Sequence, residues 1–140
     1  MSLIVKRLHP DALLPTCANA GEDLGFDIFA LEGTRIQGPT KVRTGISARF
    51  HRLFDNYGLL VRDRSSMASK GIWITGGVID AGYTGEISVI LNSIQESWVE
   101  KGDKIAQLIP IEVLTATEVI EVNELPSSQR REGAFGSTGK

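Results

Sequence analysis

The sequence contains few of the residues on which several classes of small protein depend. Cys17 is the only cysteine among 140 residues, so no disulfide can form within the chain, and we expect a reducing compartment. His9 and His51 are far apart and do not form a zinc-binding pattern with one cysteine. No stretch approaches the roughly 20 apolar residues of a membrane span, and the N-terminal hydrophobic run is too short for a signal peptide. We therefore expect a soluble, cytoplasmic protein that does not contact a membrane.

An excess of charge of one sign is also lacking. The chain has 15 basic and 17 acidic residues and a net charge of -2, which provides no basic surface for long nucleic acid. A small phosphorylated ligand needs only a few local cations, so this balance does not exclude one. Glycine, in contrast, is abundant at 15 residues, which indicates many turns and close backbone approaches. The length fits one domain with a sizeable core.

Alternation of apolar and polar residues predicts β-strands through most of the chain. Residues 41–50 place apolar side chains on even positions, and residues 86–92 alternate in the same way. The pattern continues through residues 103–114 and 116–122, with turn signals at short intervals. Short strands at this spacing indicate a β-sandwich, a barrel or a jelly roll.

The one helix that the sequence predicts is short. Residues 65–71 form one or two turns, with Ser65 or Ser66 as the N-cap and Gly71 at the end. We therefore expect an all-β fold with at most one short helix.

Residues 76–92, with the sequence GGVIDAGYTGEISVILN, raise a question. Their apolar residues read as buried strand, yet Asp80 lies among them with glycines on both sides. A buried carboxylate without a partner costs several kcal/mol or shifts its pKa. Asp80 is therefore either bound within the fold or kept for chemistry.

The C-terminal residues have a different composition from the rest. Residues 123–140 contain proline, serine, glycine and two adjacent arginines, without strand periodicity. We predict a β-barrel domain over residues 1–122 and a flexible arm over residues 123–140. Phe135 is the only aromatic residue of this arm and lies among glycines, which a purely disordered tail does not require.

Several polar groups suit a nucleoside polyphosphate. Arg64 offers a bidentate fork to phosphate oxygens, and Ser65 and Ser66 offer hydroxyls at a helix start. The GSTG sequence of residues 136–139 offers further N–H groups and hydroxyls. Phe135 can stack on a base, and Asp80 can deprotonate a water.

The end of the chain does not form a P-loop. Its final Gly-Lys would need a glycine where Ala134 stands, and no helix follows in this sequence.

Five segments, in order and spacing, resemble the five motifs of the trimeric deoxyuridine triphosphate nucleotidohydrolases (dUTPases). They are AGEDLGFDIFA from residue 20, RSSMASKGI from residue 64, GGVIDAGYTGE from residue 76, GDKIAQLI from residue 102 and REGAFGSTG from residue 131. The resemblance implies jelly-roll-like subunits with a distorted β-barrel, assembled as a homotrimer that exchanges C-terminal arms. It also implies hydrolysis of dUTP to dUMP and pyrophosphate, with Mg²⁺ on the triphosphate and active sites shared between subunits.

The same resemblance implies a role for each matching residue. Asp80 is the general base for the water that attacks the α-phosphorus. Arg64, Gln107, Ser65 and Ser66 hold phosphates and the water. Tyr83 packs on the deoxyribose and excludes a 2′-hydroxyl. In the third motif and just after it, five residues are implied to bind uracil or the sugar: Gly77, Val78, Ile79, Tyr83 and Ser88. Those implied to bind from the arm are Arg130, Phe135, Gly136, Ser137 and Thr138. Asp27 supports the site or meets magnesium through water.

The chain departs from the family pattern at a few positions. In the arm, Arg131 and Ala134 replace glycines, which puts the closure of the arm in question. Asp63 stands where proline is common, and an acid beside a phosphate site is unfavourable unless it points away or pairs with Arg62.

The sequence leaves two alternatives to dUTP hydrolysis: deamination of dCTP, and binding of nucleotide without catalysis. Related dCTP deaminases carry a catalytic Glu ten residues after the Asp, where this chain has Ile90, and an Arg where it has Ser69. An isoleucine cannot transfer a proton, which argues against deamination.

The second alternative is a trimer that binds nucleotide without catalysis. Retention of Asp80 and Gln107 argues against it.

Overall fold

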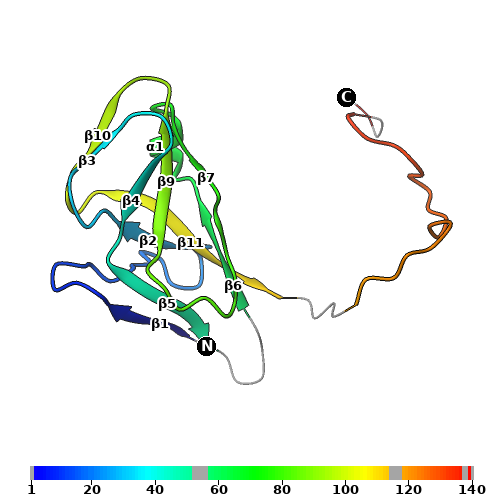
Figure 1. The fold of residues 1–140 in the computed structure, drawn as a ribbon, viewed down its shortest axis with the longest axis horizontal. Helices are drawn as coiled ribbons and strands as arrows, with labels where there is room; N and C mark the ends of the chain where they lie inside the picture. Colours follow the sequence, from blue (N-terminus) through cyan, green and yellow to red (C-terminus); the bar gives the residue numbers. More distant parts are fainter. Residues whose placement is uncertain (1, 52–56, 114–117, 137–138, 140) are drawn as a thin grey trace.

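The computed structural model describes residues 2–51, 57–113, 118–136 and 139, and their fold is almost entirely β (Figure 1). The strands are β1 (Ser2–Arg7), β2 (Phe26–Phe29), β3 (Thr34–Ile36), β4 (Thr40–Arg43), β5 (Ile46–His51), β6 (Tyr57–Arg62), β7 (Ile72–Thr75), β8 (Val78–Ile79), β9 (Ser88–Ser93), β10 (Ser97–Val99) and β11 (Lys104–Glu112). Between β6 and β7 lies the short helix α1 (Ser65–Ala68). The expected all-β, jelly-roll-like fold with one short helix is confirmed.

Two larger antiparallel sheets form the body of the domain. One has the strand order β2-β11-β6-β8 and the other the order β4-β9-β7. Two smaller pairs, β1 with β5 and β10 with β3, complete the described sheets. Neighbours in a sheet are often distant in the chain, as when β11 inserts between β2 and β6, which is the connectivity of jelly-roll-like folds.

The core follows the alternation seen in the sequence. Ile87, Val89 and Leu91 have exposed fractions of 1%, 1% and 0%, so the predicted inward face of residues 86–92 is confirmed. Val42 and Ile46 are likewise buried at 0%, although a turn at Gly45 divides residues 41–50 into β4 and β5. Apolar surface removed from water, at roughly 25 cal/mol per Å², provides the main driving force for packing these faces together.

Two local predictions are wrong. Neither serine caps α1, because Arg64 is the N-cap residue in an extended conformation and makes no side-chain capping bond. The helix also ends at Ala68, earlier than predicted. Of the strand predicted over residues 116–122, the described residues 118–122 are not strand, and residues 116 and 117 lie outside the described part.

The failed strand prediction has a physical cause. Figure 1 shows residues 118–136 apart from the strands, so no neighbouring strand can accept their backbone hydrogen bonds. Val119 is 99% exposed and Ile120 is 69% exposed. Alternation alone predicts a strand, but a strand also needs a partner. The boundary predicted between residues 122 and 123 stays a prediction.

Among the described residues, no helix is long and apolar enough to cross a membrane.

Candidate active site

The stretch from Ile72 to Ile79 pairs with two sheets in turn, and this creates a pocket. Its first half, β7, pairs with β9 as far as Thr75 opposite Ile90. Its second half, β8, leaves β9 and pairs with β6 instead. Beyond Thr75, the edges of β8 and β9 that face one another are therefore not hydrogen-bonded to each other.

Two glycines make this change of sheet possible. Gly76 has a φ of +66°, a conformation that other residues rarely adopt. Gly77 accepts a hydrogen bond from the Val61 N–H at 2.7 Å. A Cβ atom added at Gly77 would collide with the carbonyl oxygen of Val61, so a side chain cannot be placed there without a shift of the backbone. The path of the chain thus accounts for Gly76 and Gly77, the two glycines before Asp80.

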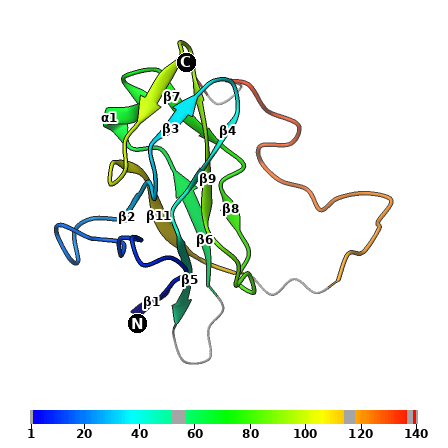
Figure 2. The same cartoon turned by 60° about the vertical axis from the view of Figure 1, so that its left-hand side comes forward.

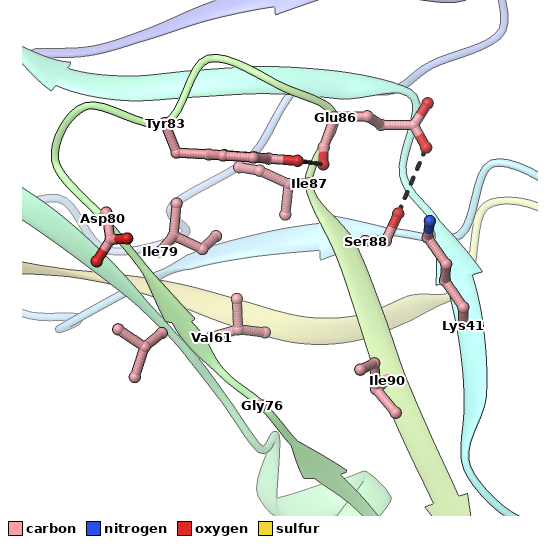
Figure 3. A pocket seen from close by; sticks show the side chains of 11 residues that line it. Lys41, Val61, Gly76, Ile79, Asp80, Tyr83, Glu86, Ile87, Ser88 and Ile90 are labelled. Carbon is pink, nitrogen blue, oxygen red and sulfur yellow. Dashed lines mark hydrogen bonds between the residues drawn. The ribbon is translucent and has the colours of Figure 1, made fainter.

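The pocket between β8 and β9 has a volume of about 380 Å³ (Figure 3). Its apolar wall comes from β6, β8, β9 and the residue before β9, and its polar groups are Lys41, Asp80, Tyr83, Glu86 and Ser88. The apolar lining residues are Val61, Val78, Ile79, Ile87 and Ile90. We name this cavity the β8–β9 pocket. An apolar slot with a few polar groups and free strand edges fits a flat, polar-edged ring.

Three residues of this stretch are more exposed than the sequence indicates. Val78 is 74% exposed and Ile90 is 36% exposed, because both line the pocket instead of the core. Asp80 is also exposed in the single chain, so it does not bear the cost of an unpaired buried charge. An exposed carboxylate at the mouth of a pocket is available to a ligand.

The loop that joins β8 to β9 is fastened to β5. Arg49 donates from Nε to the carbonyl oxygen of Ala81 at 3.0 Å, and Ser47 donates to the carbonyl oxygen of Thr84 at 2.7 Å. A backbone hydrogen bond from Tyr83 to Asp80 closes the turn. The ring of Tyr83 extends over the pocket, and its hydroxyl donates to the carbonyl oxygen of Glu86 at 2.8 Å (Figure 3). Asp80 and Tyr83 are thus held at the same opening.

An ion pair beside this pocket was not predicted from the sequence. Arg43 of β4 donates from Nε and Nη2 to the two carboxylate oxygens of Glu86, at 3.0 Å and 2.9 Å. Hydrogen bonding to Arg43 lowers the pKa of the Glu86 carboxyl, and it raises the pKa of Arg43. The partners are 43 residues apart, so only the register of β4 with β9 brings them together.

Four other predicted residues, Asp27, Arg64, Ser66 and Gln107, form a second cluster together with Lys104, which was not predicted. We name it the Arg64 cluster. Asp27 Oδ1 accepts from Arg64 Nε at 3.0 Å, and Asp27 Oδ2 lies 3.1 Å from Lys104 Nζ. Arg64 also donates from Nη1 to Ser66 Oγ at 3.2 Å. Asp27 thus orients two cations, as an anion-binding site requires. Ser65 is exposed at the start of α1.

Asp63 has a structural task in this cluster. Its carboxylate accepts the backbone N–H of Ile74 at 2.8 Å, and its carbonyl oxygen accepts a bond from Gln107 Nε2 at 2.9 Å. The carboxylate is therefore directed toward β7. An acid at this position beside Arg64 is therefore tolerated, because its carboxylate is bonded to the backbone of β7.

Within one chain, the Arg64 cluster and Asp80, at the mouth of the β8–β9 pocket, lie at opposite ends of β6. Leu59, near the start of β6, is opposite Ile79, so Asp80 is beside that start. Arg64 follows the other end of β6, which at about 3.3 Å per residue is roughly 20 Å away. Figure 2 shows the same separation between β8 and α1. Asp80 and Arg64 therefore cannot contact one α-phosphate from the same chain.

The arm lies apart from both sites. Phe135 is fully exposed and has a φ of +50°, and Arg130 Nε donates to the carbonyl oxygen of Gly133 at 2.7 Å. Arg131, where the family pattern has glycine, adopts a φ of +53°, a conformation that strains a non-glycine residue. Gly136 also has a positive φ. Ser137 and Thr138 lie outside the described residues.

Comparisons with known proteins agree with one another. A family model described as dUTPase matches residues 13–139. The deoxyuridine 5'-triphosphate nucleotidohydrolase of Hydrogenobaculum sp. (strain Y04AAS1) is 40% identical over 147 residues, which span 99% of each chain. A mutant of the Staphylococcus bacteriophage 80alpha dUTPase, solved with dUpNHpp, is similar in fold with a TM-score of 0.82, 28% identity and 99% coverage of each chain. A dUTPase from phage phi11 of S. aureus, described with a structural Mg(II) ion, has a TM-score of 0.75 and 25% identity, covering 91% of this chain and 100% of its own.

Proposed function

The chain belongs to the dUTPase family and hydrolyses dUTP, and from this premise we propose which of its residues carry the reaction. The observation that carries the proposal is the β8–β9 pocket, which has free strand edges within it and Asp80 with Tyr83 at its mouth. We assign uracil to the pocket and the deoxyribose to Tyr83.

The unpaired strand edges support recognition of uracil by the backbone. Backbone groups of Val78, Ile79 and Ser88, which line the pocket, would meet the polar edge of the ring while apolar side chains cover its faces. From Gly77 only the N–H would be available, because its carbonyl oxygen already accepts from Val61. Backbone groups have fixed positions, so this edge reads the pattern of donors and acceptors of the base. A pocket of about 380 Å³ is within the size range of small-molecule sites.

Tyr83 is assigned to the sugar. Its ring lies at the mouth of the pocket and is fixed by the bond from its hydroxyl to the carbonyl oxygen of Glu86. A rigid ring packed on the deoxyribose leaves no room for a 2′-hydroxyl. Tyr83 would then exclude ribonucleotides by sterics.

Asp80 is assigned as the general base. It takes a proton from a water whose oxygen forms a bond to the α-phosphorus. The bond from that phosphorus to the oxygen bridging toward the β-phosphate breaks, and pyrophosphate leaves with the electron pair. The exposed carboxylate beside the sugar site supports this role.

The phosphate chain requires residues from other subunits. Because Arg64 lies roughly 20 Å from Asp80 within one chain, the Arg64 cluster that completes each site would come from a neighbour in a homotrimer. Arg64, Ser65, Ser66 and Gln107 would hold the phosphates and the water there. The arm of the third subunit would bring Arg130, Phe135 and residues 136–138 over the substrate.

Magnesium would enter with the triphosphate. The described residues contain no group of three His, Cys, Asp or Glu side chains that could hold a metal ion. Both oxygens of Asp27 already contact cations, so this residue does not fit a direct metal ligand. Magnesium on the phosphates would neutralise their negative charge, and the chain's own task is to bind and orient the complex.

The test is release of pyrophosphate and ammonia from dUTP, dCTP, dTTP and UTP by the wild type and by Asp80→Asn. We expect pyrophosphate from dUTP only. Asp80→Asn should bind dUTP with similar affinity and lose at least about 100-fold in kcat, the contribution of a general base. Glu112→Gln, an exposed carboxylate outside the site, is the matched control and should keep full activity.

Other results would point to other functions. Ammonia from dCTP would indicate deamination, against the position of Ile90, whose apolar side chain lines the pocket and cannot carry a proton. No product from any nucleotide would indicate a binding protein. Full activity of Asp80→Asn would exclude Asp80 as the base.

A further inference from the structure

The ion pair between Arg43 and Glu86 lies at the edge of the β8–β9 pocket; Glu86 ends the third motif, but Arg43 lies outside all five motifs. Both carboxylate oxygens of Glu86 accept from one guanidinium, at 3.0 Å and 2.9 Å, which is the bidentate geometry that fixes orientation as well as distance. The Glu86 side chain is 20% exposed and that of Arg43 is 45% exposed. Partial burial and two bonds make this pair more ordered than a simple surface contact.

Glu86 connects this pair to Tyr83. The carbonyl oxygen of Glu86 accepts the bond from the Tyr83 hydroxyl at 2.8 Å. The ring of Tyr83 also lies against Gly85, where an added Cβ atom would be only 2.5 Å from the hydroxyl oxygen. The position of the ring therefore depends on where the backbone of Gly85 and Glu86 lies.

Other contacts fix the loop on both sides of this backbone segment. Thr84 is held through its carbonyl oxygen by Ser47, and Ile87 donates its N–H to the carbonyl oxygen of Ile46 at 2.8 Å. Between them, Gly85 has no side chain to anchor it and wide backbone freedom. The Ile87 N–H shares a planar peptide unit with the Glu86 carbonyl, so its bond to Ile46 fixes one edge of this unit. The Glu86 side chain, bonded to Arg43 and 3.5 Å from Ser88 Oγ, is a second anchor that limits the tilt of the unit.

We propose that Arg43 is a positioning residue for sugar selection: through Glu86 it holds the hydroxyl anchor of Tyr83, and so fixes the ring that separates deoxyribose from ribose. The inference rests on the proposed function, in which Tyr83 packs on the deoxyribose. Arg43 does not touch the reacting atoms in this scheme. Its loss loosens the ring while Asp80 and the Arg64 cluster stay intact.

The experiment measures kcat/KM for dUTP and for UTP with the full-length protein, and takes their ratio as the discrimination. In Arg43→Met we expect the discrimination to fall roughly three- to tenfold, the size of one lost hydrogen-bonded contact. Most of the change should be a gain in activity on UTP. Tyr83→Phe, which keeps the ring but removes the hydroxyl anchor, should have a similar effect.

The double variant Arg43→Met with Tyr83→Phe tests whether the two residues act through the same contact. If Arg43 works through the Tyr83 hydroxyl, the double variant should lose no more discrimination than one single variant does. Arg43→Lys, which keeps the charge but not the fork, should lie between the wild type and Arg43→Met. A purely structural role for Arg43 would not produce this order.

The matched control is Arg35→Met. Arg35 also binds a glutamate, Glu96, at 2.7 Å, but between β3 and β10 and outside the pocket lining. Breaking this pair should leave the discrimination unchanged. If Arg43→Met does not fold, as judged by circular dichroism and thermal melting, Glu86→Gln tests the same link, because it weakens the pair from the other side.

The outcomes are distinguishable. Unchanged discrimination in Arg43→Met, an equal effect of Arg35→Met, or losses that multiply in the double variant would overturn the role of Arg43. A wild type that does not hydrolyse dUTP, or does not prefer it to UTP, would overturn the proposed assignment of the pocket and the role of Arg43 with it.

Discussion

The separation of Asp80 from Arg64 within one chain predicts that two inactive variants restore activity to each other. In the proposed homotrimer, Asp80→Asn removes the assigned general base from every site, and Arg64→Met removes the guanidinium from every site. In mixed trimers, a site is intact when its Asp80 comes from an Arg64→Met subunit and its Arg64 comes from an Asp80→Asn subunit. With equal amounts and random assembly, about one site in four meets both conditions.

The assay uses subunits that carry two different tags. The variants are co-expressed, the mixed trimers are purified through both tags, and pyrophosphate release from dUTP is measured. Selection for both tags removes the pure trimers, and each mixed trimer has one intact site among its three, so the recovered fraction should be about one third. Each pure variant should have less than about one hundredth of the wild-type activity.

A matched mixture separates this explanation from a general effect of mixing. Arg64 and Gln107 belong to the same cluster of one chain, joined through Asp63. Mixed trimers of Arg64→Met and Gln107→Ala therefore have one of the two changes in every cluster and should stay inactive. Equal activity in both mixtures, or none in the mixture of Asp80→Asn with Arg64→Met, would refute the assignment of the two clusters to different subunits.

Three further predictions concern stability and the arm. Gly77→Ala should cost about 1–3 kcal/mol in the free energy of unfolding, because its Cβ meets a carbonyl oxygen of β6, while Gly82→Ala, with open space around its Cβ, should melt like the wild type. Equal melting temperatures would contradict this account of the strand path. Truncation after Arg131 should leave a folded protein with strongly reduced dUTP hydrolysis, and normal turnover would mean that the arm does not close the site. Arg43 lowers the pKa of Glu86 below its ordinary value of 4.5, so the stability that the carboxylate provides is complete above that value and is lost as the pH falls through the lowered pKa. Denaturant unfolding should accordingly show a difference between wild type and Glu86→Gln that is largest near about pH 7 and shrinks below about pH 4.5; a difference that does not vary with pH would count against the ion pair.

The sequence was sufficient for the features that depend on local pattern. The period of two in residues 86–92 identified the buried face of β9, and the glycine-rich segments identified the loops that carry polar groups. These predictions succeeded because alternation is a property of each strand alone. The short helix was also predicted from its local sequence. Its cap was predicted wrongly, because Arg64 in an extended conformation begins the helix and no serine side chain caps it.

The remaining features depend on which strand pairs with which. Val78 and Ile90 look like core residues in the sequence, but they line the pocket because β8 leaves β9 for β6. Glu86 ends the third motif, but no sequence pattern connects it to Arg43, since their contact depends on the register of two strands that are distant in the chain. Residues 118–122 alternate like a strand but pair with no strand in the described part of this one chain. Tertiary pairing decides each of these cases, and a single sequence contains no direct record of it.

The path of residues 72–79 joins the pocket to the need for assembly. A strand that changes sheets leaves two facing edges unpaired, and these edges form the slot that we assign to uracil. The same change places Asp80 beside the start of β6, while the sequence that follows β6 places Arg64 at its other end. In a sheet with a fixed rise of about 3.3 Å per residue, these two positions cannot approach each other without breaking β6. The geometry that creates the pocket thus prevents one chain from completing the site. Activity should therefore depend on contacts between subunits, and dilution below the trimer's dissociation constant should abolish dUTP hydrolysis without unfolding the pocket.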